Sequence, residues 1–155
     1  MILFGRVILL ISFALFWGGL TFYTGIVVRI EHDVLDEPIM AGLITQRTTN
    51  VMQALAVITV VQMGVNGFVV AGRCRRLGYI LISISTLIAL AIIGLYIVHG
   101  HLDAVIDVAA REVTDYESFA TGHRRYNQLT TVEWLSSISY LVITVIAWQR
   151  FDKEV

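Results

Sequence analysis

Residues 77–98 read LGYILISISTLIALAIIGLYIV, a run of 22 residues without a charged side chain. As a helix, this run is about 33 Å long at about 1.5 Å per residue, enough to cross the hydrocarbon core of a membrane. Membrane strands alternate apolar with polar residues, whereas this run is apolar at both alternating positions. The run therefore predicts a transmembrane helix.

Three further stretches have the same character, so the predicted spans are residues 7–28, 48–72, 77–98 and 126–149, of which only the last contains a charge. Hydrophobic residues make up 57% of the 155 residues and charged residues 15%, and the mean hydropathy is +0.77. A net charge of −1 and a single cysteine exclude a nucleic-acid-binding surface and a disulfide scaffold. The sequence predicts an all-α integral membrane four-helix bundle, one domain over residues 1–155, with the lipid bilayer as its surroundings.

The loop between the second and third spans fixes the predicted orientation. Residues 72–76 hold three arginines and no acid, while ten of the 12 acidic residues fall on the opposite side if all four spans cross. Basic residues are enriched in cytoplasmic loops. We therefore expect a multi-pass protein of the bacterial inner (plasma) membrane with both termini in the cytoplasm.

The segment between the third and fourth spans is the longest loop expected. From His99 onward it mixes apolar residues such as Leu102 and Ile106 with acids. This amphipathic pattern predicts short helices that lie on the outer surface between spans three and four.

Two short motifs occur once in each half of the chain. His-x-x-Leu-Asp stands at residues 32–36 and 99–103, and Arg-x-x-Asn at residues 47–50 and 124–127. The repetition leaves open whether the two helical hairpins arose by duplication.

The arginines of the second motif are predicted to close the outer mouths of the hairpins. An arginine at the start of a helix is disfavoured by the positive end of the helix dipole unless an acid compensates it. Arg47 and Arg124 are therefore expected to pair with aspartates of the outer loops. The aspartates are Asp36 and Asp103, and the asparagines expected to cap or bridge the helix ends are Asn50 and Asn127.

All four histidines fall on the predicted outer side. His99 and Asp103 are one helical turn apart, and so are His32 and Asp36. A mixed imidazole and carboxylate set suits zinc or copper(II). The residues predicted to form a divalent-metal site are His99, His101, Asp103, His32 and Asp36. The alternative is that these are hydrogen-bonded interfacial residues, and haem or a quinone are alternative cofactors.

Polar residues inside the spans are costly in lipid and normally face neighbouring helices. Glu133 lies in the fourth span, and Gln62 and Asn66 share one face of the second. They are predicted to hydrogen-bond between helices, with the lining of a substrate or quinone site as the alternative.

The run Phe16–Gly25 (FWGGLTFYTG), followed by a polar loop and Asn50, resembles small four-span bacterial membrane proteins of unknown function. The later pattern Phe119-x-x-x-His123-Arg124-x-Tyr126, leading to residues 130–134 (TTVEW), resembles the same group. More distantly, the layout is similar to anthrone-oxygenase-like and copper-resistance-D-like membrane domains. The resemblance implies a four-helix bundle with a polar site on its outer face, but the methionine-rich outer motifs of a copper handler are missing.

The sequence therefore favours a small inner-membrane protein whose histidine and carboxylate cluster binds a metal or small ligand, as in a membrane oxidoreductase. The alternative is a non-catalytic accessory or structural subunit of a larger membrane complex. Because no catalytic motif is present, the sequence leaves open whether the chain is an enzyme and whether it forms a homo-oligomer. No nucleic-acid partner is expected.

Overall fold

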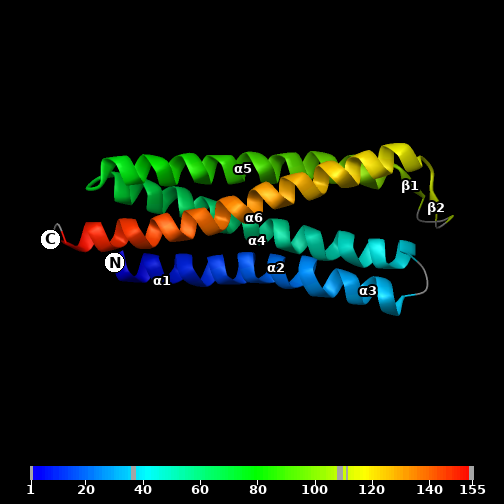
Figure 1. The fold of residues 1–155 in the computed structure, drawn as a ribbon, viewed down its shortest axis with the longest axis horizontal. Coiled ribbons are helices and arrows are strands. Elements are labelled where there is room, and N and C mark those ends of the chain that lie inside the picture. The colour runs from blue at the N-terminus through cyan, green and yellow to red at the C-terminus, as the bar shows by residue number, and fades with distance from the viewer. Residues whose placement is uncertain (1, 36–37, 108–109, 111, 154–155) are drawn as a thin grey trace.

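A computed structural model describes residues 2–35, 38–107, 110 and 112–153. Within these residues, four helices are long and apolar enough to cross a membrane: Ile2–Val34, Met40–Ala71, Arg75–Ala104 and Tyr116–Lys153. They run along the long axis of the molecule, and both chain termini lie at the same end (Figure 1). We call that end the inner end and the opposite end the outer end.

The first helix is not a regular α-helix along its whole length. Two π-helical segments, η1 and η2, interrupt it. Such segments are rare in proteins overall, and those that occur are often found at functional sites. The five parts are α1 (Ile2–Phe13), η1 (Ala14–Gly18), α2 (Gly19–Phe22), η2 (Tyr23–Val27) and α3 (Val28–Val34).

The remaining chain forms three helices and one small pair of strands. Helix α4 begins at the only proline of the sequence, which fits the first turn because its missing N–H has no partner there in any case. A short turn at residues 72–74 joins α4 to α5. The bounds are α4 (Pro38–Ala71), α5 (Arg75–Ala104), β1 (Ile106–Asp107), β2 (Glu112–Val113) and α6 (Tyr116–Lys153).

All four helices extend beyond the predicted spans, and the predicted separate helices between spans three and four are wrong. Residues 99–104 continue α5, and α6 begins ten residues before the predicted fourth span. Charged residues mark the edge of the hydrocarbon region, but they do not break a helix. The link that remains is the antiparallel pair β1–β2, in which Ile106 is opposite Val113.

Asp115 explains why α6 starts early. Its carboxylate accepts hydrogen bonds from the backbone N–H groups of Glu117 (3.1 Å) and Ser118 (3.0 Å), which satisfies donors that the first helical turn leaves free. Hydrogen bonds from the Ser118 side chain and backbone lower the pKa of Asp115 from its ordinary value.

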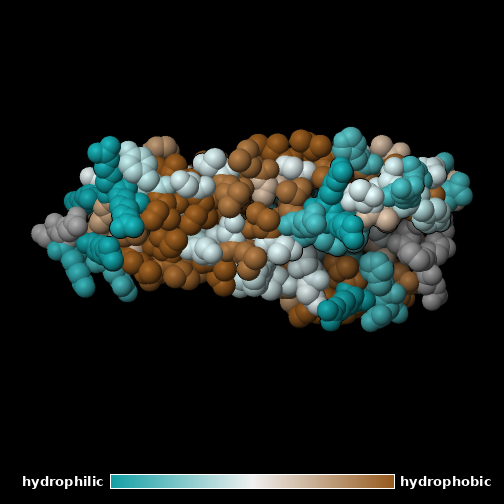
Figure 2. Space-filling view, turned by 45° about the horizontal axis from the view of Figure 1, so that its top comes forward, coloured by the Kyte–Doolittle hydropathy of each residue, from teal (hydrophilic) through white to brown (hydrophobic). Residues whose placement is uncertain are grey.

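Helix α5 packs extensively against both α4 and α6, and the first helix packs against α4. Helices α4 and α5 approach closely at the inner end, where a Cβ atom on Gly78 would collide with the backbone of Ala71. Figure 2 shows apolar surface over the middle of the molecule and hydrophilic residues gathered at both ends. This distribution fits a protein whose middle is surrounded by lipid.

Two sets of polar contacts join the helices at and near the inner end. Arg6 forms a two-pronged ion pair with Asp152 (2.7 and 2.8 Å), which ties the first helix to the end of α6. Closer to the middle, Asn66 donates to the Tyr140 hydroxyl (2.8 Å) and accepts from the Trp148 indole N–H (2.9 Å). The Asn66 amide therefore connects α4 to two turns of α6.

Candidate functional site

A carboxylate on the first helix is held by hydroxyl groups at the outer end. Tyr23 donates to both Glu31 oxygens (3.1 and 3.2 Å), and Thr45 of α4 donates to one of them (3.1 Å). Tyr23 is buried, whereas Glu31 and Thr45 are half-buried. These contacts join the first helix to α4 through a negatively charged group.

A second set of polar side chains lies deeper between α4, α5 and α6. Tyr126 of α6 lies near Thr49 of α4 and near Thr130 of its own helix. The His99 ring of α5 lies 6.3 Å from the Tyr126 ring. Tyr126 therefore lies near residues of both α4 and α5.

We call this set the outer polar cluster and define it by the residues that carry it from each helix. From the first helix they are Tyr23 and Glu31, from α4 Thr45, Thr49 and Gln53, from α5 His99, and from α6 Tyr126, Thr130 and Glu133.

Glu133 is the most deeply placed acid of the cluster, with only 3% of its surface exposed. Between residues 2 and 153, as far as the structure describes them, the ion pairs are Arg6–Asp152 and His99–Asp103, and neither involves Glu133. Burying a carboxylate without a counter-charge costs several kcal/mol. This cost is comparable to the whole free energy of unfolding of a marginally stable protein. The cluster therefore contains a buried acid that no basic side chain of the described residues neutralises.

Several polar atoms of the cluster, and one atom of Trp17, are buried without a hydrogen-bond partner among the described residues. Gln53, only 4% exposed, has neither its amide nitrogen nor its amide oxygen bonded, and one atom each is unbonded in His99 (Nε2), Thr130 (Oγ1) and Trp17 (Nε1). Each such group costs about 1 to 3 kcal/mol relative to a bonded one. In proteins such groups are satisfied by ordered water, by an ion or by a bound ligand.

The π-helical part of the first helix packs against Trp134, the residue after Glu133. Trp17 in η1 stacks on Trp134, with ring centroids 5.4 Å apart, and the Trp134 indole N–H donates to Thr21 (2.8 Å). The first helix also approaches α4 here. A Cβ atom on Gly19 would lie 3.2 Å from the sulfur of Met52, the residue before Gln53. The irregular turns of the first helix thus stand at the depth of the two buried groups.

Of the five residues predicted to bind a metal, the structure brings two together. His99 Nε2 lies 3.7 Å from Asp103 Oδ1, and Asp103 also accepts a hydrogen bond from Gln46 (2.6 Å). His32 contacts its own helix, with Nδ1 2.8 Å from the carbonyl oxygen of Val28, and His101 is exposed. Asp36 lies outside the described residues. No group of three His, Cys, Asp or Glu side chains able to hold a metal occurs within the described ranges.

The predicted pairing of Arg124 with Asp103 is wrong. Asp103 contacts Gln46 and His99 instead, and Arg124 is exposed. The reason is that α4 and α6 begin at Pro38 and Tyr116, so neither Arg47 nor Arg124 stands at the positive end of a helix dipole.

The other predicted polar residues fall in three kinds of place. Asn50 and Asn127 are exposed within helices rather than at helix ends, and Asn127 accepts a bond from Thr131 only through its backbone carbonyl (2.8 Å). Asn66 forms the interhelical bonds described above. Gln62 is half-buried, and its side-chain oxygen has no partner within the described part of the chain.

The sequence interpretation singled out Glu133 and His99 but did not group Thr49, Gln53 and Tyr126 with them. Two spacings carried the information: Thr49 and Gln53 are one turn apart, and Tyr126 and Glu133 are two turns apart, so each pair shares a helix face. Glu31 had no such signal, because only the fold shows that Tyr23 and Thr45 surround it.

Comparison of the chain with models of protein families, with curated proteins and with solved structures found no match. The resemblance to small four-span bacterial membrane proteins therefore stays a prediction, and the function is argued from the site alone.

Proposed function

We propose that this chain is a membrane protein that binds a small ligand in the outer polar cluster. The observation that carries the proposal is that Glu133 is buried without an ion-pair partner among the described residues, while both polar atoms of Gln53 and the hydroxyl of Thr130, about one turn before Glu133, are buried without a hydrogen bond. A ligand with hydrogen-bonding groups would satisfy these atoms, and it would offset the cost of burying them.

The chemistry of the cluster favours a ligand that carries positive charge or several hydrogen-bond donors. Its acids are Glu31 and Glu133, and around them stand hydroxyl and amide groups with acceptor oxygens. No Lys or Arg takes part in the contacts that define the cluster. A small cation or an ammonium group is therefore complementary to it.

A divalent metal at the outer face is a narrower form of the same proposal. His99 and Asp103 would supply two ligands, and water would complete the shell, as in open metal sites. With a redox-active ligand, the same site would serve a membrane oxidoreductase.

Ligand binding is tested by thermal unfolding of the purified protein in mild detergent with four probes: Zn²⁺, Na⁺, methylammonium and a short-chain quinone. We expect at least one probe to raise the unfolding temperature, since a ligand at 100 times its Kd stabilises by about 2.7 kcal/mol. Glu133→Gln, which keeps the shape of the side chain, should abolish the shift. The exposed acid Glu117 lies on the same helix, and Glu117→Gln should leave the shift unchanged.

Two outcomes would overturn this proposal. One is that no probe stabilises the wild-type protein, which would favour the accessory-subunit alternative, with co-migration of a heavy partner as its positive sign. The other is that the shift persists in Glu133→Gln. Loss of a Zn²⁺ shift alone in His99→Ala would assign the metal form of the site.

We further propose that the four helices form one bundle in the bacterial inner membrane, with the inner end in the cytoplasm. The support is the contact of the first helix with both α4 and α6, and the three arginines of the turn between α4 and α5. Single cysteines at Arg73 and Thr114, in a Cys74→Ser background, test the orientation. A membrane-impermeant maleimide should label Thr114→Cys in intact cells and Arg73→Cys only after lysis; the reverse pattern would refute the orientation.

A further inference from the structure

An apolar groove of about 360 Å³ runs between α5 and α6 at the outer end, separate from the residues that define the outer polar cluster. Its lining comes from two helix faces. On α5 these residues are Gly94, Ile97 and Val98, and on α6 they are Arg125, Gln128, Leu129 and Val132. The α6 residues follow the spacing i, i+3, i+4, i+7, so they form one stripe along the helix.

The groove opens toward the surroundings of the protein. Ile97 is 59% exposed and Val132 is 39% exposed. Leu129 closes its floor against Gly94, where a Cβ atom would lie 3.0 Å from the Leu129 methyl carbon. In a membrane, such an opening faces lipid chains rather than water.

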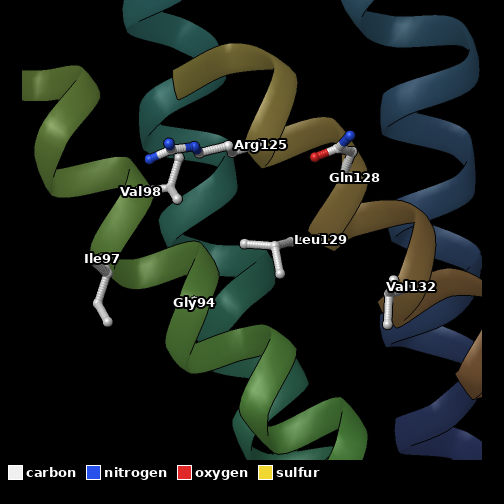
Figure 3. Close-up of a pocket in the computed structure, with 7 residues that line it drawn as sticks. All are labelled: Gly94, Ile97, Val98, Arg125, Gln128, Leu129 and Val132. Carbon is white, nitrogen blue, oxygen red and sulfur yellow. The ribbon is translucent and has the colours of Figure 1, made fainter. Parts of the chain in front are cut away.

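A positive charge stands at the mouth of this groove. Figure 3 shows the Arg125 side chain extending from α6 toward Val98 of α5, with Leu129 and Gly94 deeper along the same groove. Arg125 takes part in neither of the ion pairs that the described residues form. Its guanidinium group is therefore available to an external anion.

The charge and the groove meet at the edge of the apolar region. The uncharged run of α5 ends at Val98, and Arg125 is the last charged residue of α6 before its apolar segment. Val132 lies seven residues after Arg125, so the groove extends roughly 10 Å along α6 from this charge toward the middle of the molecule. An amphiphile with an anionic head and an apolar chain matches this order of charge and apolar surface.

We propose that the groove between α5 and α6 binds a phospholipid with a net negative headgroup, its phosphate on Arg125 and one acyl chain along Gly94, Leu129 and Val132. The charge of Arg125 selects the headgroup, and the apolar floor holds the chain. This site does not depend on the ligand proposed for the outer polar cluster.

Native mass spectrometry of the full chain in mild detergent tests the proposal. Phosphatidylglycerol and phosphatidylcholine with identical acyl chains are the probes. We expect the wild-type protein to retain phosphatidylglycerol with about fivefold preference, as one arginine near a headgroup would give. Arg125→Gln should bring the preference close to one. Arg124→Gln removes the same charge from a neighbouring exposed residue outside the groove, and it should keep the preference.

A second pair of variants tests the apolar part of the site. Val132→Trp fills the groove and should lower the retention of both lipids, whereas Val142→Trp adds the same bulk at an exposed position of α6 outside it. Equal retention of the two lipids by the wild-type protein would overturn the proposal. An equal loss of the preference for phosphatidylglycerol in Arg125→Gln and Arg124→Gln would also overturn it. So would a Val132→Trp protein that retains both lipids as the wild-type protein does and unfolds at the same temperature.

Discussion

Replacing Gly78 with valine is expected to destabilise the protein by about 3 kcal/mol or more. The Cβ atom of any side chain at this position collides with the backbone of Ala71, and a backbone cannot move aside as a flexible side chain can. Helices α4 and α5 would have to separate at their inner end, where the turn at residues 72–74 holds them together. The measurement is unfolding of the purified protein by heat or by a denaturing detergent.

Gly64→Val is the matched control for this substitution. Gly64 lies on α4, and a Cβ atom there would meet nothing within 4 Å. The change should leave stability unchanged or raise it slightly, because it reduces the freedom of the unfolded chain. Equal effects of the two valines would show that α4 and α5 do not approach each other at Gly78 as described.

Asn66→Leu is expected to cost about 1 to 2 kcal/mol. The change removes the acceptor of the Trp148 indole N–H, whereas the Tyr140 hydroxyl keeps a second partner, the carbonyl oxygen of Met63 (2.7 Å). The loss should appear as a lower unfolding temperature and as a shift of Trp148 fluorescence.

Gln62→Leu, one turn away on α4, should behave in the opposite way. Its side-chain oxygen is buried without a partner in the described ranges, so an apolar replacement removes an unsatisfied group and should be neutral or stabilising. If Gln62→Leu destabilised as much as Asn66→Leu, the difference in hydrogen bonding between the two amides would not be the cause.

The number of helices followed from the sequence because a membrane imposes one rule, that backbone polar groups must be bonded within the segment. Helix lengths did not follow, since residues such as Asp115 and Pro38 start helices well outside the apolar region. Both are ordinary start signals, and reading them would have corrected the ends of α4 and α6.

Only the most unusual residues of the candidate site were predicted from the sequence. Glu133 stood out because a charge interrupts an apolar run, and His99 because it precedes an aspartate by one turn. The neighbours of Glu133 and Tyr126 come from other helices, and the rotation of one helix against another is not encoded in the spacing along either. For the same reason, the pairing of Asp103 with Gln46 replaced the one expected with Arg124.

The first helix is anchored separately at its two ends, and its π-helical segments lie between the two anchors. Arg6 fixes one end to Asp152 of α6, and Glu31 fixes the other to α4 through Thr45. In a uniform α-helix, each residue turns the chain by about 100°, so both anchors align only for certain lengths. An insertion or deletion within η1 or η2 would therefore change the rotation at which Arg6 and Glu31 meet their partners.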